Sequence, residues 1–357
     1  MWGFSGYPWA VSLAPPAPAV LVANPTAQSG RAQAWIARAR ELLDAAGLVH
    51  DFIPTLPDSA TVGEVRRAID QAGCRLVVAL GGDGTFAEAA KGILGSASAG
   101  EVALGMLPMG TANDQGKSFG LRAGLDALEE NVAVVRRGAI SEMDVGVVKR
   151  LDEADRITHS DLYFDSMSIG LGASVLAERN RDRDRVAEIP LVRSFYRNHL
   201  VYAGALLKKL ARSATGRATF ELEAEVDGET FHYRSVIDVI IKNTRIYGGE
   251  WVLAPDGLAD DGLFEMVPIC GLGELTSRAI STLRRSPIGE YEMAQLGIQP
   301  ARPVPGRSFV LTVMQPGASA DPAAQIDGEE FPAGDRFRIE VLPRVLRLVV
   351  PRACGNG

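Results

Sequence analysis

The sequence predicts a two-domain protein: an α/β domain with a parallel sheet in three layers, followed by a mostly antiparallel β-sandwich. Up to about residue 141, short apolar runs alternate with segments of helical periodicity, which is typical of repeated β–α units with right-handed crossovers. Beyond that point, period-two stretches replace the helices, which favours antiparallel strands. We expect residues 1–17 to form an aromatic extension, 18–141 the α/β domain, and 142–357 the sandwich, with the last residues able to return to the first domain.

The first half contains the elements of a parallel sheet. We expect strands at 19–23, 49–54, 75–80 and 102–107, helices at 32–46 and 61–71, and a helix start at 86–90. Apolar side chains of the first helix share one face, and Gly73 ends the second helix. Parallel sheets of this kind bind ligands at the carboxyl ends of their strands.

The second half contains strands that alternate between two faces. We expect them at 219–226, 231–241, 309–314 and 336–341. In the last of these, Phe337, Ile339 and Val341 share one face. Asp227-Gly228 between two strands predicts a hairpin turn.

Composition narrows the class of protein. The 357 residues include 46% apolar residues and carry a net charge of −7, so a large core is expected and a nucleic-acid partner is not. Cys74, Cys270 and Cys354 lie far apart, which fits neither a disulfide framework nor a zinc site and favours a reducing cytoplasm. No apolar stretch reaches transmembrane length. The aromatic N-terminus lacks the basic region of a signal peptide, and it either packs on the domain or contacts a membrane interface.

The first half is organised around Gly81-Gly82-Asp83-Gly84-Thr85, between an apolar strand and a helix. Glycines permit a tight turn and a close approach of backbone N–H groups to a phosphate, and the following helix favours negative charge there. A carboxylate such as Asp83 would repel phosphate, so it is better suited to holding Mg²⁺ or a proton. A plain strand-to-helix turn is the alternative. A second turn, residues 108–114, follows the next strand and is expected to converge on the same ligand.

These two turns, taken with later motifs, resemble the diacylglycerol kinase catalytic-domain family, which includes bacterial soluble diacylglycerol kinases, sphingosine kinases and ceramide kinases. The further matching motifs are Tyr247-Gly248-Gly249, Ala254-Pro255, Asp260-Asp261-Gly262-Leu263 and Asp327-Gly328-Glu329. They occur in family order over roughly residues 19–351. The glycine motif is shared with NAD kinases, whereas Gly-Thr-Ala-Asn-Asp and Asp-Asp-Gly-Leu favour the lipid kinases.

The resemblance implies an NAD-kinase- and diacylglycerol-kinase-like fold, with ATP and Mg²⁺ as cofactors. It assigns ATP binding to residues at the ends of the parallel strands: Thr55, Gly81, Gly82, Asp83, Gly84, Thr85, Glu88, Gly110, Thr111 and Asn113. It also assigns a catalytic Mg²⁺, held partly through water, to Asp83, Asp114 and Asp144, of which Asp144 could equally be a surface carboxylate. A structural Mg²⁺ is assigned to Leu258, Asp261 and Leu263, where an ordinary Asp-Gly turn is the alternative.

The family analogy makes Glu329 the general base that accepts the proton of the attacking hydroxyl. Asp227-Gly228-Glu229 repeats the same three residue types, but we expect it to be only a hairpin turn. Asp83 is the second candidate for the base, although a metal-bound carboxylate would be a weak proton acceptor.

Residues 179–217 bear on the substrate, because they carry ten basic and three acidic residues with apolar residues near helical spacing. Such a segment either lies on an anionic membrane or forms a solvated helix face. We expect a cytoplasmic lipid kinase, peripheral on the inner membrane face, that acts on a diacylglycerol-like lipid. The alternatives are a ceramide or sphingoid-base kinase, an NAD kinase and a catalytically inactive regulator. The sequence also leaves a homodimer as one option for the oligomeric state.

Overall fold

A computed structural model divides the chain into two compact units. Unit 1 comprises Met1–Val145 and Pro343–Gly357, and unit 2 comprises Gly146–Leu342. The structure describes residues 18–27, 32–110, 112–137, 139–174, 176–177, 219–248, 251–272, 289, 298–300, 302–314 and 322–352. The basic segment 179–217 and the aromatic N-terminal extension, residues 1–17, therefore lie outside the described residues.

Unit 1 alternates strands and helices as the apolar periodicity predicts. Its elements in chain order are β1 (Ala19–Ala23), α1 (Ala32–Ala45), β2 (His50–Pro54), α2 (Ala60–Ala72), β3 (Leu76–Gly81), α3 (Asp83–Leu94), the 3₁₀ turn η2 (Ala99–Glu101), β4 (Ala103–Pro108), α4 (Asp114–Ser118), the 3₁₀ turn η3 (Leu125–Ala127), α5 (Leu128–Arg137) and the first part of β5 (Ile140–Leu151). Gly73 ends α2 in the left-handed conformation, as expected of a helix C-terminus.

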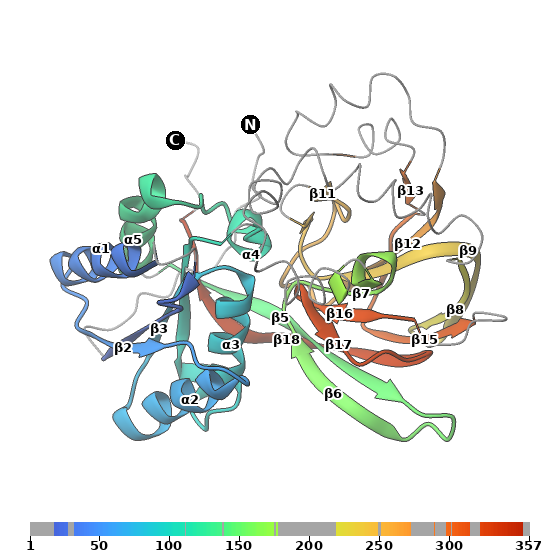
Figure 1. Ribbon diagram of the computed structural model, residues 1–357, viewed down its shortest axis with the longest axis horizontal. Helices are drawn as coiled ribbons and strands as arrows, with labels where there is room; N and C mark the ends of the chain where they lie inside the picture. The colour runs from blue at the N-terminus through green and yellow to red at the C-terminus, as the bar shows by residue number, and fades with distance from the viewer. Residues whose placement is uncertain are drawn as a thin grey trace, which may run out of the picture. The chain divides into compact units, whose positions relative to one another are not determined.

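The sheet of unit 1 is parallel. Strand β1 pairs with both β2 and β3, and β4 pairs with β3 on one side and with the end of β18 (Arg336–Val349) on the other. Helices α1 and α5 pack together, and α2 packs against α3 on the other side of the sheet (Figure 1). This confirms the three-layer α/β architecture, and it brings the carboxyl ends of β1, β2, β3 and β4 to one edge.

Unit 2 is built almost wholly from strands. They are the rest of β5, then β6 (Ile157–Tyr163), β7 (Ser166–Gly170), β8 (Phe220–Val226), β9 (Glu229–Lys242), β10 (Ile246–Tyr247), β11 (Trp251–Val252), β12 (Phe264–Leu272), β13 (Ile298–Pro300), β14 (Val304–Gly306), β15 (Ser308–Met314), β16 (Ala324–Ile326), β17 (Glu329–Phe331) and the first part of β18.

The strand pairs of unit 2 whose register is defined are antiparallel. Alternate side chains of β7, β8, β9, β12, β15, β16 and β18 meet in one buried apolar core, which includes Phe220, Phe264, Phe309 and Phe337. Burial of such side chains contributes about 1.5–3 kcal/mol each. The predicted antiparallel sandwich is confirmed.

Strand β18 is longer than the period-two pattern predicts. The alternation ends at Val341, but the strand continues to Val349. Its first part pairs with β15 in unit 2, and Arg347 and Leu348 pair with β4 in unit 1. The expected strand of residues 336–341 was therefore too short, because the buried face changes where the strand passes from unit 2 into unit 1.

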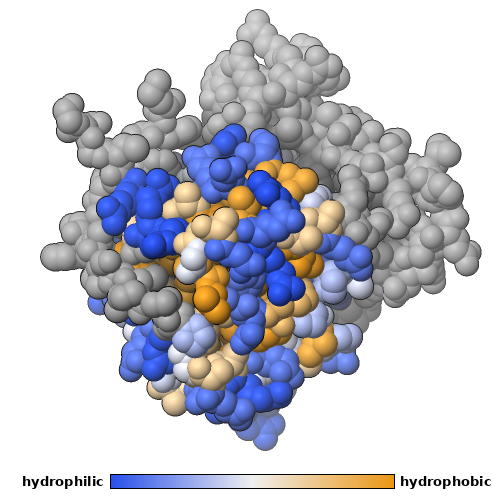
Figure 2. Space-filling model, turned by 90° about the vertical axis from the view of Figure 1, so that its left-hand side faces the viewer, coloured by the Kyte–Doolittle hydropathy of each residue, from blue (hydrophilic) through white to orange (hydrophobic). Residues whose placement is uncertain are grey.

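Hydrophilic residues dominate the face shown in Figure 2, and the described apolar residues lie between them in small groups. No helix in the part of the chain that the structure describes is long and apolar enough to cross a membrane.

Candidate active site

The first glycine turn is tighter than the sequence suggests. Strand β3 ends at Gly81, Gly82 caps the helix, and α3 begins at Asp83, not at Phe86 as expected. The first helical hydrogen bond runs from Phe86 N–H to the Gly82 carbonyl at 3.1 Å. The N–H groups of residues 83–85 therefore have no acceptor within the helix, and they lie at the positive end of the helix dipole. This is a favourable place for a phosphate.

The two predicted turns lie against each other through their glycines. A Cβ on Gly110 would come within 2.4 Å of the Gly82 Cα, and a Cβ on Gly82 within 3.2 Å of the Gly110 Cα. Met109 and Gly110 both donate N–H groups to the Gly81 carbonyl, at 2.8 and 3.2 Å. Only residues without a side chain allow this backbone contact, so the two turns pack directly against each other.

This contact predicts a large difference between two glycine substitutions. Gly110→Ala is expected to destabilise unit 1 by about 1–3 kcal/mol, because the added methyl group collides with backbone atoms. Gly63→Ala is the matched control, since its Cβ would meet nothing within 4 Å in helix α2, and it should stabilise by about 0.5–1 kcal/mol. Chemical unfolding measures both, and equal effects would contradict the close packing of the turns.

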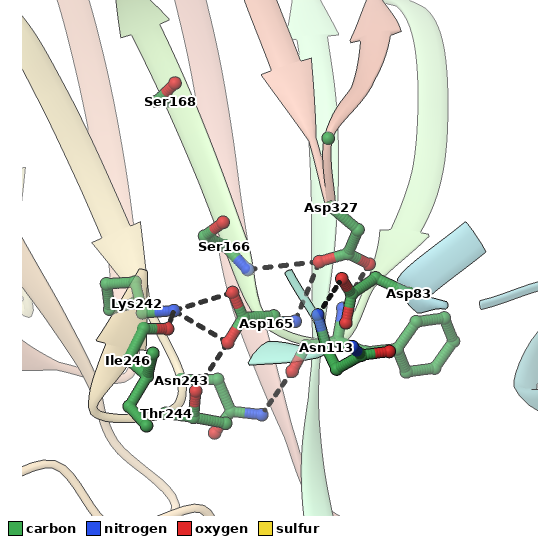
Figure 3. A network of polar contacts seen from close by, with 12 residues as sticks. Asp83, Asn113, Asp165, Ser166, Ser168, Lys242, Asn243, Thr244, Ile246 and Asp327 are labelled. Carbon is green, nitrogen blue, oxygen red and sulfur yellow. Dashed lines mark hydrogen bonds and ion pairs between the residues drawn. The ribbon is translucent and has the colours of Figure 1, made fainter. Parts of the chain in front are cut away.

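Asp83 connects the two turns. Its Oδ2 accepts a hydrogen bond from Asn113 N–H at 3.0 Å (Figure 3). Asn113 has a left-handed φ of 54°, and its side chain both accepts from Gly110 N–H at 2.9 Å and donates to the Gly110 carbonyl at 2.8 Å. Asp83 therefore holds the second turn in place, a structural role that the sequence did not reveal.

The remaining predicted nucleotide residues lie at the same edge or close to it. Thr55 directly follows β2 and donates its N–H to the Ala23 carbonyl at the end of β1, at 2.9 Å. Thr85 lies in the first turn of α3, where its Oγ1 fills the space beside Gly81. Gly84 and the half-buried Glu88 are also on α3. Thr111 lies outside the described residues.

The three carboxylates assigned to the catalytic Mg²⁺ have different surroundings. Asp114 begins α4 and is 7% exposed. Asp144 is fully buried on β5, and its Oδ1 accepts Arg344 N–H at 2.7 Å, so the surface alternative for this residue is wrong. Among the described residues, no three His, Cys, Asp or Glu side chains are grouped to hold a metal. Carboxylate donors suit Mg²⁺, which usually keeps several waters and phosphate oxygens, so the donor type fits but a preformed cage is not present in this part of the chain.

The loop assigned to the structural Mg²⁺ concentrates negative charge. Asp261 Oδ1 accepts Leu263 N–H at 2.9 Å, and Leu258 is exposed. Burial, followed by repulsion from Asp261, raises the pKa of Glu265 to about 8, and its buried Oε2 has no hydrogen-bond partner in the described structure. Oxygen donors of this kind fit a hard divalent cation.

This loop predicts a stabilising effect of Mg²⁺. With Mg²⁺ in about 100-fold excess over its Kd, the ion should raise the melting temperature of the protein by roughly 3–8 °C. Asp261→Asn should abolish that rise, whereas Asp51→Asn, an exposed change in unit 1, should leave it intact. Thermal unfolding with Mg²⁺ and with a chelator measures the effect. An unchanged rise in Asp261→Asn would leave this loop as an ordinary turn.

Both Asp-Gly-Glu sequences form two-residue hairpin turns. Asp227-Gly228 joins β8 to β9, and Asp327-Gly328 joins β16 to β17. All four residues have positive φ, between 47° and 88°, which is typical of type I′ turns. The hairpin predicted at the first copy is confirmed, but the second copy is a hairpin too, so turn geometry does not distinguish Glu229 from Glu329. Both glutamates are exposed.

The two turns differ in what their aspartates hold. Asp327 accepts N–H groups from Phe164, Asp165 and Ser166, at 2.8, 2.8 and 3.1 Å (Figure 3). Burial and the nearby Asp165 raise the pKa of Asp327 to about 7, which these N–H donors oppose. Asp227 instead accepts N–H groups from Arg307 and Ser308 on the surface. The second turn is therefore anchored to a buried polar network.

That network centres on a buried ion pair that the sequence analysis missed. Lys242 Nζ lies 2.6 Å from both carboxylate oxygens of Asp165 and donates to the Ile246 carbonyl at 2.6 Å (Figure 3). The side chains of Lys242 and Asp165 are 0% and 4% exposed. Thr244 Oγ1 also donates to Asp165, and Asn243 Nδ2 donates to the Phe164 carbonyl. The available signal was polar residues inside otherwise apolar strand runs, at Asp165-Ser166 and Lys242-Asn243.

A parallel α/β unit with paired glycine turns at its strand ends, in one chain with an antiparallel sandwich, defines a class of two-unit α/β and β-sandwich proteins whose first glycine turn suits a phosphate group. Residues 18–148 match the diacylglycerol kinase catalytic domain, and residues 181–350 match the YegS C-terminal NAD kinase β-sandwich-like domain. The chain belongs to the diacylglycerol kinase catalytic-domain family of lipid kinases. This confirms the resemblance seen in the sequence.

Named relatives cover most of the chain. It is 28% identical to the probable lipid kinase YegS of Escherichia fergusonii, over 82% of this chain and 84% of that protein. It is 26% identical to a probable lipid kinase YegS-like protein of an Enterobacter species, with the same coverage. A solved diacylglycerol kinase structure from Bacillus anthracis has a TM-score of 0.61 and 15% identity, over 95% of this chain and 98% of that one, which supports the fold.

Proposed function

We propose that the protein transfers the γ-phosphoryl group of ATP to the primary hydroxyl of a membrane lipid. The observation that carries this is the backbone contact between the Gly82 and Gly110 turns at the carboxyl ends of β3 and β4. A helix N-terminus beside such a turn binds phosphates, and the family is one of lipid kinases.

The residues of unit 1 would position the nucleotide. The N–H groups at the start of α3 would bind phosphate oxygens, and Gly110, Thr55 and Thr111 would line the nucleotide site. Asp83, Asp114 and Asp144 would hold Mg²⁺, in part through water. When bound, Mg²⁺ supplies charge neutralisation at the transferring phosphoryl group.

The residues of unit 2 would handle the acceptor. Glu329 would take the proton from the lipid hydroxyl as its oxygen attacks the γ-phosphorus, and the bond to the bridging oxygen of ADP would break. The products are ADP, the lipid phosphate and a proton carried by Glu329. The buried network behind Asp327 would keep the backbone of this turn in one position.

Diacylglycerol-like lipids are the first choice of substrate, with ceramide or a sphingoid base as alternatives. The test is incubation with labelled ATP and Mg²⁺ in the presence of diacylglycerol, ceramide, a sphingoid base or NAD, with the products separated by chromatography. We expect a labelled lipid phosphate. Label on NAD alone would replace the proposal by an NAD kinase, and no labelled product at all would favour an inactive regulator.

We also propose that residues 179–217, which lie outside the described residues, contact an anionic membrane. Reversal of Arg193, Arg197, Lys208 and Lys209 to Glu should weaken binding to anionic vesicles, because each basic residue near the surface contributes about 1 kcal/mol. Activity on detergent-dispersed lipid should largely survive. Vesicle sedimentation measures the binding, and unchanged binding would contradict a membrane role for this segment.

A further inference from the structure

The position of Glu329 depends on the hairpin turn that precedes it. Strand β17, which begins at Glu329, is the outermost strand of its sheet in the described part of the chain and pairs there with β16. Across the turn Asp327-Gly328, Glu329 lies opposite Ile326. Among the described residues no second strand borders β17, so the conformation of the turn sets the direction in which this strand begins.

The left-handed backbone of this turn needs support from its surroundings. Asp327 and Gly328 have φ of 47° and 81°, and such values are disfavoured for a residue with a side chain. Asp327 is held by its N–H group, which donates to the Ser166 carbonyl at 2.9 Å, and by the three bonds that its carboxylate accepts. Gly328, the residue next to Glu329, is held by a different side chain.

That side chain is the amide of Gln325. Its Oε1 accepts Gly328 N–H at 2.7 Å, and its Nε2 donates to Ser168 Oγ on β7 at 3.1 Å. Gln325 and Ser168 are directly opposite each other in the pair of β16 and β7, and they are 4% and 0% exposed. Reversing the amide would place its NH₂ group against Gly328 N–H, so only one orientation satisfies both bonds. Gln325 thus ties the peptide group before Glu329 to β7.

The two Asp-Gly-Glu turns differ at this position. Two residues before Asp227, the first turn has Glu225, which lies on β8 opposite Thr230 and Val310 and is exposed. The buried amide beside the turn is therefore a feature of the second copy, the one that carries the proposed base.

We propose that Gln325 is a positioning residue for phosphoryl transfer, which fixes Gly328 and through it the carboxylate of Glu329. This inference rests on the proposed function, in which Glu329 accepts the proton of the lipid hydroxyl. A general base works only within hydrogen-bond reach of the proton that it takes. A displacement of about 1 Å in a reacting group lowers turnover by up to about 10²-fold. Gln325 acts through Glu329 and needs no contact with a substrate.

The first test is Gln325→Met, which keeps the length of the side chain and removes both hydrogen-bonding groups. We expect kcat with the best lipid acceptor to fall by about tenfold or more, while KM for ATP stays within about twofold of wild type. Glu225→Met is the matched control, because it places the same residue two positions before the other Asp-Gly pair, and it should leave kcat unchanged. Thermal unfolding verifies that each variant is folded at the assay temperature.

A double variant separates positioning from a general structural defect. If Gln325 acts through Glu329, Gln325→Met should lower kcat no further in a protein that already carries Glu329→Gln, because residues that act as a unit are not additive. The same further loss in both backgrounds, or an unchanged kcat in Gln325→Met alone, would overturn the proposal. If Gln325→Met does not fold, Ser168→Ala replaces it in the same cycle, with an expected loss of about threefold or more in kcat.

A measurement without substrate distinguishes failure of this inference from failure of the proposed function. Hydrogen–deuterium exchange at Gly328 should be about tenfold faster or more in Gln325→Met, because its N–H group loses its acceptor. Exchange at Gly228 should match wild type. If the wild type phosphorylates no lipid, the proposed function fails. Faster exchange at Gly328 alone then supports Gln325 as the residue that fixes this turn, and unchanged exchange overturns it.

Discussion

Replacing Glu329 by glutamine is expected to lower kcat by about 10²–10⁴-fold while KM for ATP changes little. Glutamine keeps the size of the side chain but cannot take the proton of the attacking hydroxyl. Because the nucleotide residues lie in unit 1 and Glu329 lies in unit 2, the substitution should separate the chemical step from ATP binding. Steady-state kinetics with the best lipid acceptor measure both parameters.

Glu229→Gln is an unusually close control. Glu229 and Glu329 both follow an Asp-Gly pair with positive φ, both begin a strand, and both are exposed. A substitution at Glu229 should change stability by no more than about 0.5 kcal/mol and leave turnover unchanged. If both substitutions have small, equal effects on kcat, the general base is Asp83 or a water molecule and not Glu329. A large loss at Glu229 alone would show that the first copy is the catalytic one.

Asp83→Asn is expected to lower kcat by about 10²–10³-fold with the fold retained. The amide oxygen of asparagine can still accept Asn113 N–H, so the contact between the two turns should survive. The lost charge would instead weaken the position of Mg²⁺. Turnover at saturating ATP and Mg²⁺, together with ATP affinity from equilibrium binding, distinguishes a catalytic loss from a folding defect.

Glu129→Gln is the control for Asp83→Asn. It also removes one negative charge from the first turn of a helix, because Glu129 lies in the first turn of α5 and is exposed. It should have near-normal turnover. If Asp83→Asn also turns over at a near-normal rate, Asp83 does not position the metal. Its role would then be limited to holding the second turn through Asn113.

The periodicity of the sequence was sufficient to predict the core elements of unit 1. Residues 19–23 and 102–107 differ from β1 and β4 by at most one residue at each end, because short apolar runs between helices have few alternative structures. The start of α3 was misplaced because glycine and aspartate have low helix propensity. At Asp83 the backbone contact with the second turn outweighs that propensity.

The contacts that give the candidate site its shape could not be predicted in the same way. The partners of Asp327 are about 160 residues away in sequence, and the Lys242–Asp165 pair is separated by 77 residues. Local patterns contain no information about such pairs. From its residue type alone, Asp144 is expected to be exposed. In the structure its Oδ1 accepts a hydrogen bond from Arg344 N–H in the interior, and this bond removes much of the free-energy cost of burying the carboxylate.

The passage of β18 from unit 2 into unit 1 has a consequence for synthesis on the ribosome. Strand β4 ends at Pro108, but its partner residues, Arg347 and Leu348, follow about 240 residues later in the chain. At about 5–20 residues per second, the intervening chain takes on the order of 10–50 s to emerge. During that time the edge of β4 lacks its final neighbour, and unpaired edges invite aggregation.

A nascent chain therefore cannot complete its first compact unit until the second part of β18 has been made. The same reasoning applies to prematurely terminated chains: a stop before Pro343 would leave the α/β sheet without its last strand, even though every residue from β1 to α5 had been made. Such fragments should be prominent clients of chaperones and proteases, whereas a chain that includes β18 supplies the missing strand itself.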